Sequence, residues 1–262
     1  MKIIINLICA LGIVFYGQAQ ILKKAIPNKL VVLTFDDAPA SHYSTVAPLL
    51  QKFGFGATFF VCEFPPNFKD STLYMNWRQI KALADMGFEI ANHTRTHTNV
   101  TKLSQVKFHN ELDYIKQKCD SLQILKPMNF AYPGYGLSSD VLTFLNKQEV
   151  VFARAGGRRA YDPLTDHPYL IPSWAPNADN KEEILAALEK AHDGKIVILT
   201  FHGVPDVEHP WVTTPLELFK EYLSYLAQNG YKVIAVKNLE AYINVDEAKN
   251  TIVPDLTKEL TN

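Results

Sequence analysis

Ionisable side chains stand at the ends of short apolar runs in this sequence. Asp36 and Asp37 follow "LVVLTF", His93 follows "FEIAN", and His202 follows "KIVILTF". Neighbouring carboxylates repel one another, and each of them needs water, hydrogen-bond donors or a cation. A solvated turn, where Asp and Pro are common, is the alternative explanation of the two aspartates. The recurrence of the pattern instead indicates a site with acid–base or metal chemistry.

The spacing of His93 and His97, taken together with their place after an expected strand, indicates a metal site. Imidazoles four residues apart on one helical turn point the same way and can share an ion. A carboxylate from another strand end would complete a three-ligand site with open positions for water. One Asp with two His suits Zn²⁺ best, while Co²⁺, Mn²⁺ and Fe²⁺ stay open. The alternative is two exposed polar residues on a helical turn.

Short apolar runs alternate with amphipathic segments along the chain. Strands are expected at 29–35, 56–63, 88–93, 128–134, 150–157, 195–203 and 232–236. Helices are expected at 46–53, 76–87, 104–119, 138–148, 181–192, 215–230 and 238–243. The Pro- and aromatic-rich stretch 158–180 is expected to be an irregular loop.

Repeated strand–helix units imply a parallel sheet with right-handed crossovers. Seven or eight units in about 240 residues predict an α/β fold, a distorted (β/α)7-8 barrel. An open doubly wound sheet is the alternative, although no Gly-rich fingerprint follows the first strand. Chemistry in a parallel barrel lies at the carboxyl ends of the strands. The aspartates, the histidines and the Tyr132–Pro133 pair that ends "FAYP" should therefore converge there.

Composition and length narrow the function classes. The 262 residues carry 26 Lys and Arg against 27 Asp and Glu, a net charge of -1. That balance does not support a nucleic-acid partner. We expect one catalytic barrel over 28–245, and a polar tail over 246–262 that docks weakly or frays.

The first residues have the pattern of an export signal. Lys2 precedes an apolar run, and the small residues Gly17 and Ala19 follow it. The run is shorter than the roughly 20 residues of a membrane-spanning helix. We therefore predict a signal peptide at 1–19 and a periplasmic or extracellular protein without a stable membrane span. An uncleaved membrane anchor is the alternative. The two remaining cysteines, Cys62 and Cys119, are expected at opposite ends of the barrel as free thiols.

Four motifs in order, "TFDDAP", "NHTRTH", "FAYPG" and "VILTFHG", resemble the motif set of the NodB-homology polysaccharide deacetylases, carbohydrate esterase family 4. The resemblance implies a distorted (β/α) barrel and metal-dependent removal of acetyl groups from N- or O-acetylated carbohydrate. It implies that Asp36 is the catalytic base and His202 the catalytic acid. It also implies that Asp37, His93 and His97 hold the metal.

Two departures from the family pattern concern the base and the pocket. The family's third motif usually carries an Arg that braces the catalytic base, and Ala131 stands in its place. Arg154 or Arg158 is expected to supply the missing guanidinium from another position. Thr200 replaces a Leu two residues before the catalytic His, which is expected to alter the pocket for the acetyl methyl group.

Substrate-binding candidates come from the same rim. Tyr132 and Pro133 belong to the third motif, and Trp174 is a candidate aromatic wall. Asp162 or Asp166 is a candidate partner that orients His202. In the loop "HGVPDVEHPWVTTP", Trp211 and His209 could form a platform for a sugar ring. A buried packing role is the alternative for Trp211.

Two other functions stay open. The chain could be a metal hydrolase that acts on a small amide or ester, or a carbohydrate-binding barrel with impaired catalysis. The intact Asp36 argues against a binding module, which needs no base beside a metal. The missing third-motif Arg argues for it.

Overall fold

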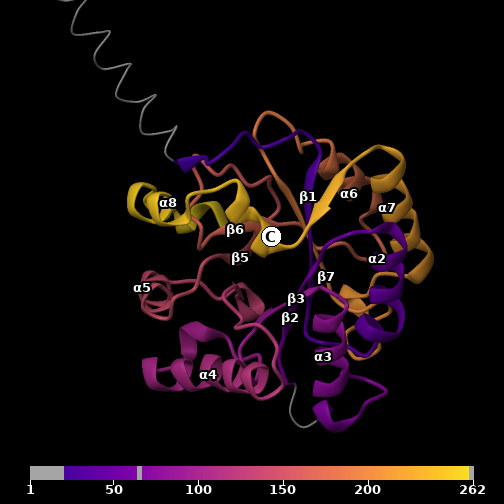
Figure 1. The fold of residues 1–262 in the computed structure, drawn as a ribbon, viewed down its shortest axis with the longest axis horizontal. Helices are drawn as coiled ribbons and strands as arrows, with labels where there is room; N and C mark the ends of the chain where they lie inside the picture. The colour runs from indigo at the N-terminus through magenta and orange to yellow at the C-terminus, as the bar shows by residue number, and fades with distance from the viewer. Residues whose placement is uncertain (1–20, 64–66, 260–262) are drawn as a thin grey trace, which may run out of the picture.

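A curled parallel sheet surrounded by helices forms the core of the fold (Figure 1), and the computed structural model describes residues 21–63 and 67–259. The strands are β1 Leu30–Asp36, β2 Thr58–Val61, β3 Glu89–Asn92, β4 Phe130–Ala131, β5 Ala153–Gly157, β6 Ile171–Ser173, β7 Val197–Phe201 and β8 Lys232–Ile234. Neighbouring strands follow the order β6-β5-β4-β3-β2-β1-β7, and β8 also pairs with β1. All of these pairings are parallel. The predicted distorted (β/α) barrel is confirmed.

The barrel closes between β6 and β7 at a narrow seam made of isolated bridges. Trp174, directly after β6, pairs in parallel with Leu199, and Tyr161 pairs with Ile196. The Trp174 N–H donates to the Ile198 carbonyl at 3.0 Å. The expectation of an irregular loop over 158–180 is therefore wrong at β6. That strand has three residues and a central proline, which cannot donate a ladder hydrogen bond, so its pattern is weak.

Alternation along the strands separates an inner from an outer core. Leu30 and Val32 of β1 belong to a cluster that fills the barrel, together with Phe60, Ala91, Ala131, Phe152, Ile171, Ile198 and Ile234. Val31, Leu33 and Phe35 face the other way and pack beneath the helices. The same period of two places Asp36 on the inner side of β1, at its carboxyl end.

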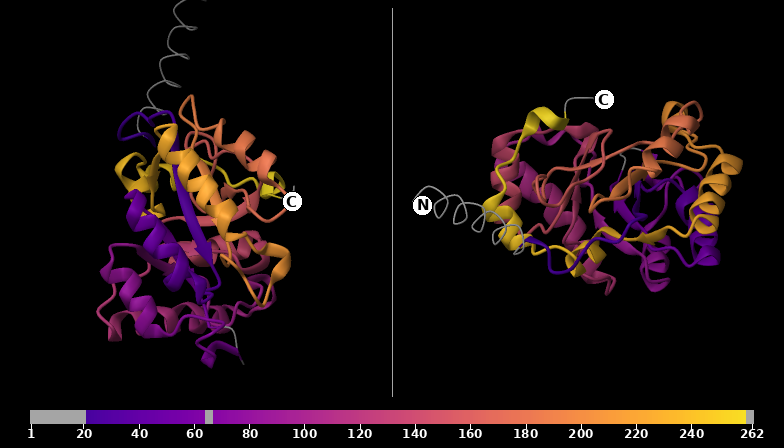
Figure 2. Two further views of the ribbon diagram at one scale, coloured as in Figure 1. Left: turned by 90° about the vertical axis from the view of Figure 1, so that its right-hand side faces the viewer. Right: turned by 90° about the horizontal axis from the view of Figure 1, so that it is seen from above.

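The helices pack around the strands, and Figure 2 shows α2 and α7 on one side of the sheet with α4 and α5 on the other. They are α2 Ala47–Phe53, α3 Trp77–Asp85, α4 Gln105–Ser121, α5 Ser139–Lys147, α6 Lys181–Leu188, α7 Leu216–Gln228 and α8 Val245–Thr251. A π-turn at His42–Val46 leads into α2. Short 3-10 turns lie at Asn67–Lys69, Val100–Lys102, Pro133–Tyr135, Pro210–Val212, Val236–Ala241 and Leu256–Glu259. The helix expected at 238–243 is therefore a 3-10 turn.

Local sequence signals explain where several helices begin and end. The Asn76 side chain accepts from the Gln79 N–H, and the Gln79 side chain accepts from the Asn76 N–H, which is a capping box before α3. Ser104 and Ser138 cap α4 and α5 with their hydroxyls. Gly54 ends α2 in a left-handed conformation that a glycine adopts without strain.

The ends of the barrel domain differ from the sequence expectation. Ala248 of α8, which falls within the expected tail, is buried in the inner cluster, so the expectation of weak docking is wrong for this helix. The predicted signal peptide lies outside the described residues. Among the helices that are described, none has the length and apolar character needed to cross a membrane. Cys62 and Cys119 are buried free thiols, as predicted.

Candidate active site

Two left-handed turns present the polar side chains at the carboxyl ends of β1 and β3. Directly after β1, Asp37 has φ +73 and Ala38 has φ +56. Directly after β3, Thr94 has φ +61 and His97 has φ +54. Non-glycine residues adopt this region only at a cost in conformational energy, and such strain persists where the surrounding structure enforces it. The two turns bring the side chains of Asp37, His93 and His97 close together.

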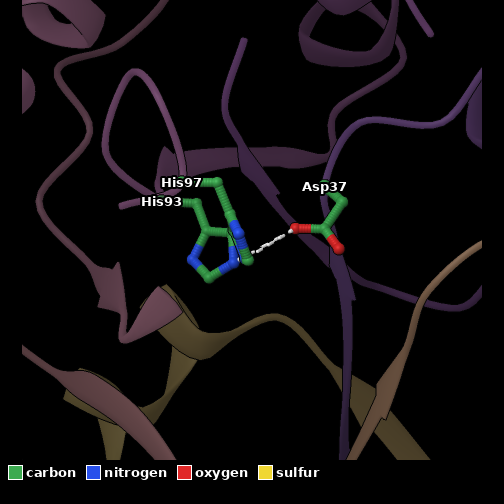
Figure 3. A group of neighbouring side chains, drawn as sticks. All are labelled: Asp37, His93 and His97. Carbon is green, nitrogen blue, oxygen red and sulfur yellow. Dashed lines mark ion pairs between the residues drawn. The ribbon is translucent and has the colours of Figure 1, made fainter. Parts of the chain in front are cut away.

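Asp37, His93 and His97 form the cluster that Figure 3 shows. The Nε2 atoms of His93 and His97 each lie 3.3 Å from Oδ1 of Asp37. One ligand atom from each residue lies within 4.8 Å of the others, which is a spacing that could hold a metal ion. Residues 93–97 form an irregular loop rather than the expected helical turn, yet the two imidazoles still converge.

The surroundings of the cluster suit metal ligands. Nδ1 of His93 lies 2.9 Å from the carbonyl oxygen of Ala131, so Nδ1 carries the proton and Nε2 is left to bind. Such a carbonyl contact fixes both the tautomer and the ring orientation of a ligating histidine. Sγ of Cys62 lies 4.0 Å from Oδ1 of Asp37. Burial, followed by the charges of Asp37 and Asp36, raises the pKa of Cys62, which keeps it a neutral thiol.

The electrostatics of the cluster favour an ionised carboxylate and one neutral imidazole. Burial alone would raise the pKa of Asp37, but the hydrogen bond from His93 and the charges of His97 and His202 hold it well below its usual range. Burial and the neighbouring His93 lower the pKa of His97 to about 4. Burial also disfavours charged His93, but Asp36 and Asp37 outweigh burial and raise its pKa. Coordination requires the deprotonated forms of both residue types.

Asp36 is held by an arginine from across the barrel. Nη2 of Arg154 donates to Oδ2 of Asp36, and both side chains are buried. Arg154 is paired in register with Ala131 across β4 and β5. Ala131, which stands at the third-motif position, thus has Arg154 as its neighbour on the adjacent strand. The buried Oδ1 of Asp36 has no hydrogen-bond partner among the described residues, so this oxygen can accept a proton.

His202 lies on the opposite side of the cluster from the β3 loop. Its Nε2 lies 3.8 Å from Oδ2 of Asp37, and its buried Nδ1 has no hydrogen-bond partner among the described residues. The main chain of His202 is fixed by His42, whose Nε2 lies 2.8 Å from the His202 carbonyl oxygen. Burial lowers the pKa of His42 to about 4, so its neutral ring donates this bond.

A cavity of about 250 Å³ opens onto the two aspartates, His93, His97 and His202. Its other walls include Tyr132, Tyr135, His209 and Trp211. The side chain of Trp211 is largely exposed, at 70%, so a buried packing role for it is wrong. Its ring lies edge-on to His209 at 5.4 Å. Asp206 accepts from the backbone N–H of His209 at 2.8 Å and lies 3.2 Å from its Nδ1. The loop after β7 thus presents an aromatic face and an oriented imidazole to the cavity.

Several sequence candidates lie outside this cavity. Trp174 is buried at the barrel seam, where it packs into the outer core, and therefore forms no wall of the cavity. Pro133 is buried in a 3-10 turn. Thr200 points into the barrel, where its hydroxyl contacts Thr34 at 3.0 Å. Tyr132, in contrast, lines the cavity, and its backbone N–H donates to the Arg154 carbonyl at 3.2 Å.

The remaining charged candidates have other partners. Arg158 pairs with Glu183 at the surface. Asp166 accepts from Arg159 and from the backbone N–H of Asp162, and neither aspartate contacts His202. In contrast, the sequence reasoning missed the contacts made by Asp206, His42 and Cys62. The closeness of Asp206 to His202, four residues earlier in the sequence, was a signal that could have found it. Nothing in the sequence around His42 or Cys62 indicates their contacts.

Comparisons with known proteins agree with the geometry. The sequence model described as "polysaccharide deacetylase" matches residues 23–153. A bifunctional xylanase/deacetylase from Pseudobutyrivibrio xylanivorans is 26% identical over 213 residues, which are 81% of this chain but only 30% of that protein. A peptidoglycan-N-acetylglucosamine deacetylase from Bacillus cereus is 26% identical over 220 residues, 83% of this chain and 92% of that protein.

A solved structure shows the same fold. The carbohydrate esterase family 4 domain of a multidomain xylanase, from the hindgut metagenome of Trinervitermes trinervoides, superposes with a TM-score of 0.57. It is 22% identical, and the match covers 82% of this chain and 91% of that domain. With half of the chain matched by the family's sequence model, the chain belongs to the polysaccharide deacetylase family.

Proposed function

We propose that this protein is an exported, metal-dependent deacetylase that removes acetyl groups from an N- or O-acetylated glycan. The observation that carries the proposal is the different surroundings of two neighbouring carboxylates. Asp37 shares one oxygen with two imidazoles. Asp36 is bound by Arg154 through one oxygen, and its other oxygen has no partner among residues 21–63 and 67–259. The first environment suits a metal ligand, and the second suits a general base.

The donor set of Asp37, His93 and His97 fits a divalent metal, with Zn²⁺ as the first choice. A bound divalent cation polarises the acetyl carbonyl and lowers the pKa of nearby water. Asp36 accepts the proton of the attacking water on Oδ1, and Arg154 fixes the orientation of that carboxylate. His202 protonates the departing sugar nitrogen or oxygen. Trp211 and Tyr132 border the space for the sugar ring.

The metal assignment is tested by His97→Ala, with His192→Ala as its matched control. His192 is an exposed histidine that pairs only with the adjacent Asp193 among the contacts described. We expect His97→Ala to abolish stoichiometric binding of Zn²⁺ in calorimetric titrations and to abolish acetate release. The control should keep both. If wild-type protein bound no divalent ion after reconstitution, the metal assignment would fail.

The substrate class is tested by acetate release across a panel of N- and O-acetylated glycans, with small aryl acetates alongside. A glycan deacetylase should give its highest kcat/KM on at least one glycan. A preference for the small acetates throughout would instead support a hydrolase of small esters.

A further inference from the structure

The loop that carries two of the three candidate metal ligands is held by groups outside it. This loop, residues 93–98, which we call the metal loop, presents the rings of His93 and His97 to Asp37 (Figure 3). The side chain of His93 is 2% exposed, and its Nδ1 contacts the Ala131 carbonyl oxygen. The side chain of His97 is 26% exposed. The position of the His97 ring therefore depends more on its own backbone.

The backbone of His97 is left-handed, with φ +54, which a non-glycine residue adopts only at a cost in conformational energy. Such a conformation persists where neighbouring contacts enforce it. Glu111, within α4, makes these contacts. Its Oε2 accepts from the backbone N–H of Thr96 at 2.7 Å, and its Oε1 accepts from the Thr96 hydroxyl at 3.1 Å.

The contact with Glu111 extends to both neighbours of His97. The Thr96 hydroxyl has one proton, and that proton is donated to the carboxylate of Glu111. The Thr98 hydroxyl lies 2.9 Å from the Thr96 hydroxyl oxygen, so Thr98 must be the donor in this second pair. One carboxylate thus connects the residues on either side of His97 to a long helix.

Helix α4 is itself attached to the strand that precedes the metal loop. Nδ2 of Asn92, the last residue of β3, donates to the Leu112 carbonyl at 2.9 Å. Oδ1 of Asn92 accepts from the Thr94 N–H, also at 2.9 Å. Leu112 is buried and directly follows Glu111 in the sequence. Glu111 therefore belongs to a regular element anchored in the fold, which is where a supporting group keeps a site most precisely.

A second carboxylate beside the metal loop makes a different kind of contact. The backbone N–H of Glu63, two residues after β2, donates to the Arg95 carbonyl at 2.6 Å. The side chain of Glu63 accepts from Trp77 at 2.8 Å, from Tyr114 at 2.7 Å and more distantly from Nε of Arg95 at 3.4 Å. The closest contact of Glu63 with the loop therefore does not need its carboxylate.

We propose that Glu111 is a positioning residue that sets the metal affinity of the site by holding His97 in its left-handed conformation. The inference rests on the proposed function, because it takes Asp37, His93 and His97 as metal ligands. With the hydrogen bonds from Thr96 in place, the ring of His97 is oriented before an ion arrives. Binding then costs less conformational entropy than it would in a loosely held loop.

The test measures the affinity of the metal-free protein for Zn²⁺ by calorimetric titration. Glu111→Ala removes both acceptor oxygens and should weaken binding about 10–100-fold, the usual cost of losing a group that orients a ligand. Glu111→Gln keeps one acceptor oxygen for two donors and should weaken binding less. Glu63→Gln is the matched control, because it removes the same charge beside the same loop and keeps the backbone contact. It should bind Zn²⁺ with wild-type affinity.

Two further measurements separate positioning from a general loss of stability. Thr96→Val removes the hydroxyl but keeps the backbone N–H, so its effect on Zn²⁺ affinity should not add to that of Glu111→Ala. Urea titrations of the metal-free proteins report the stability of each variant. A Glu111→Ala protein that is less stable but has wild-type Zn²⁺ affinity would overturn the inference. An equal loss of affinity in Glu63→Gln and Glu111→Gln would overturn it too, because charge alone would then explain the effect.

The inference and the proposed function can fail separately. Wild-type protein that binds Zn²⁺ but releases no acetate from any glycan would contradict the proposed function, while the Zn²⁺ affinities would still decide the role of Glu111. If Glu111→Ala did not fold, wild-type affinity in both Glu111→Gln and Thr96→Val would overturn the inference. Wild-type protein that bound no divalent ion would contradict both.

Discussion

Two buried carboxylates, one at each end of the barrel, differ in their hydrogen bonds. Glu89, at the start of β3, accepts hydrogen bonds from Thr58 at 2.7 Å, from Asn129 at 2.5 Å and from the backbone N–H of Lys237 at 2.8 Å. Asp36, at the carboxyl end of β1, is also buried, but its Oδ1 has no such partner in the part of the chain that the structure describes.

The contrast extends to the backbone. Glu89 opens a regular strand, whereas the turns that follow β1 and β3 contain left-handed residues such as Ala38. Groups that are fully hydrogen-bonded in a relaxed backbone stabilise a fold. Groups left unpartnered in a strained backbone mark the place where a ligand completes the structure. Glu89 therefore stabilises the fold at the amino end of β3, whereas Asp36 keeps an oxygen open to a ligand at the carboxyl end of β1.

Asp36→Asn should have the largest effect, a loss in kcat on the order of 10²–10⁴ with Zn²⁺ binding retained, because an amide accepts no proton from water. Raising the pH should partly restore turnover, since hydroxide then forms without a base. The substitution also removes the charged partner of buried Arg154 and should lower stability. Adding Arg154→Met should recover stability in urea titrations but not activity. Full turnover by Asp36→Asn would show that another group is the base.

Glu89→Gln should produce the reverse pattern, a lower free energy of unfolding with unchanged kcat per folded molecule. The new amide nitrogen meets the donor of Asn129, so one buried hydrogen bond becomes a clash of donors, at a cost of about 1–3 kcal/mol. Glu217→Gln, on the exposed face of α7, is the control and should change stability little. A loss of activity in Glu89→Gln would contradict the separation of the two ends.

The contribution of Glu89 to the free energy of unfolding should depend on pH. Burial outweighs the hydrogen bonds and raises the pKa of Glu89. The folded state therefore binds this proton more tightly than the unfolded chain does. The contribution of Glu89 to stability is complete below its unfolded pKa and declines as the pH rises through the folded pKa. Urea titrations at several pH values measure the difference in stability between wild type and Glu89→Gln. This difference should become smaller as the pH rises from the unfolded pKa of Glu89 through its folded pKa.

The smallest effect should come from a pair of alanines. Ala91 lies in regular β3 and Ala38 in the left-handed turn, and both are buried. Glycine weakens a strand, but at Ala38 it also relieves the left-handed strain. Ala91→Gly should thus lower the free energy of unfolding by about 1 kcal/mol more than Ala38→Gly. Equal losses in thermal denaturation would show that the turn after β1 stores no strain.

The sequence predicted the elements whose signals are local. Long apolar strands such as β1 and β7 were recognisable, and the rule that chemistry lies at the carboxyl ends of parallel strands grouped Asp36, Asp37, His93 and His202 before any coordinates. Arg154 was predictable as a candidate because it lies near the end of another expected strand. The sequence could not decide between Arg154 and Arg158. The strand register, which pairs Arg154 with Ala131, decides it.

Features that depend on closure of the barrel could not be read from local patterns. Strand β6 is too short and contains Pro172, so its pairing is decided by its neighbours. Trp174 looked like a rim aromatic because nothing in its sequence shows that it bridges to Leu199. Asp206 was missed for a different reason: its contact with His209, three residues further on, is local, but the irregular loop gives no periodic pattern that would indicate it.

The wall of the barrel between β6 and β7 is closed by few hydrogen bonds. The two bridges that close it, Trp174–Leu199 and Tyr161–Ile196, are isolated, whereas β1 and β7 pair over five residues. Local opening of the wall should therefore begin there, as it does where few hydrogen bonds hold a segment.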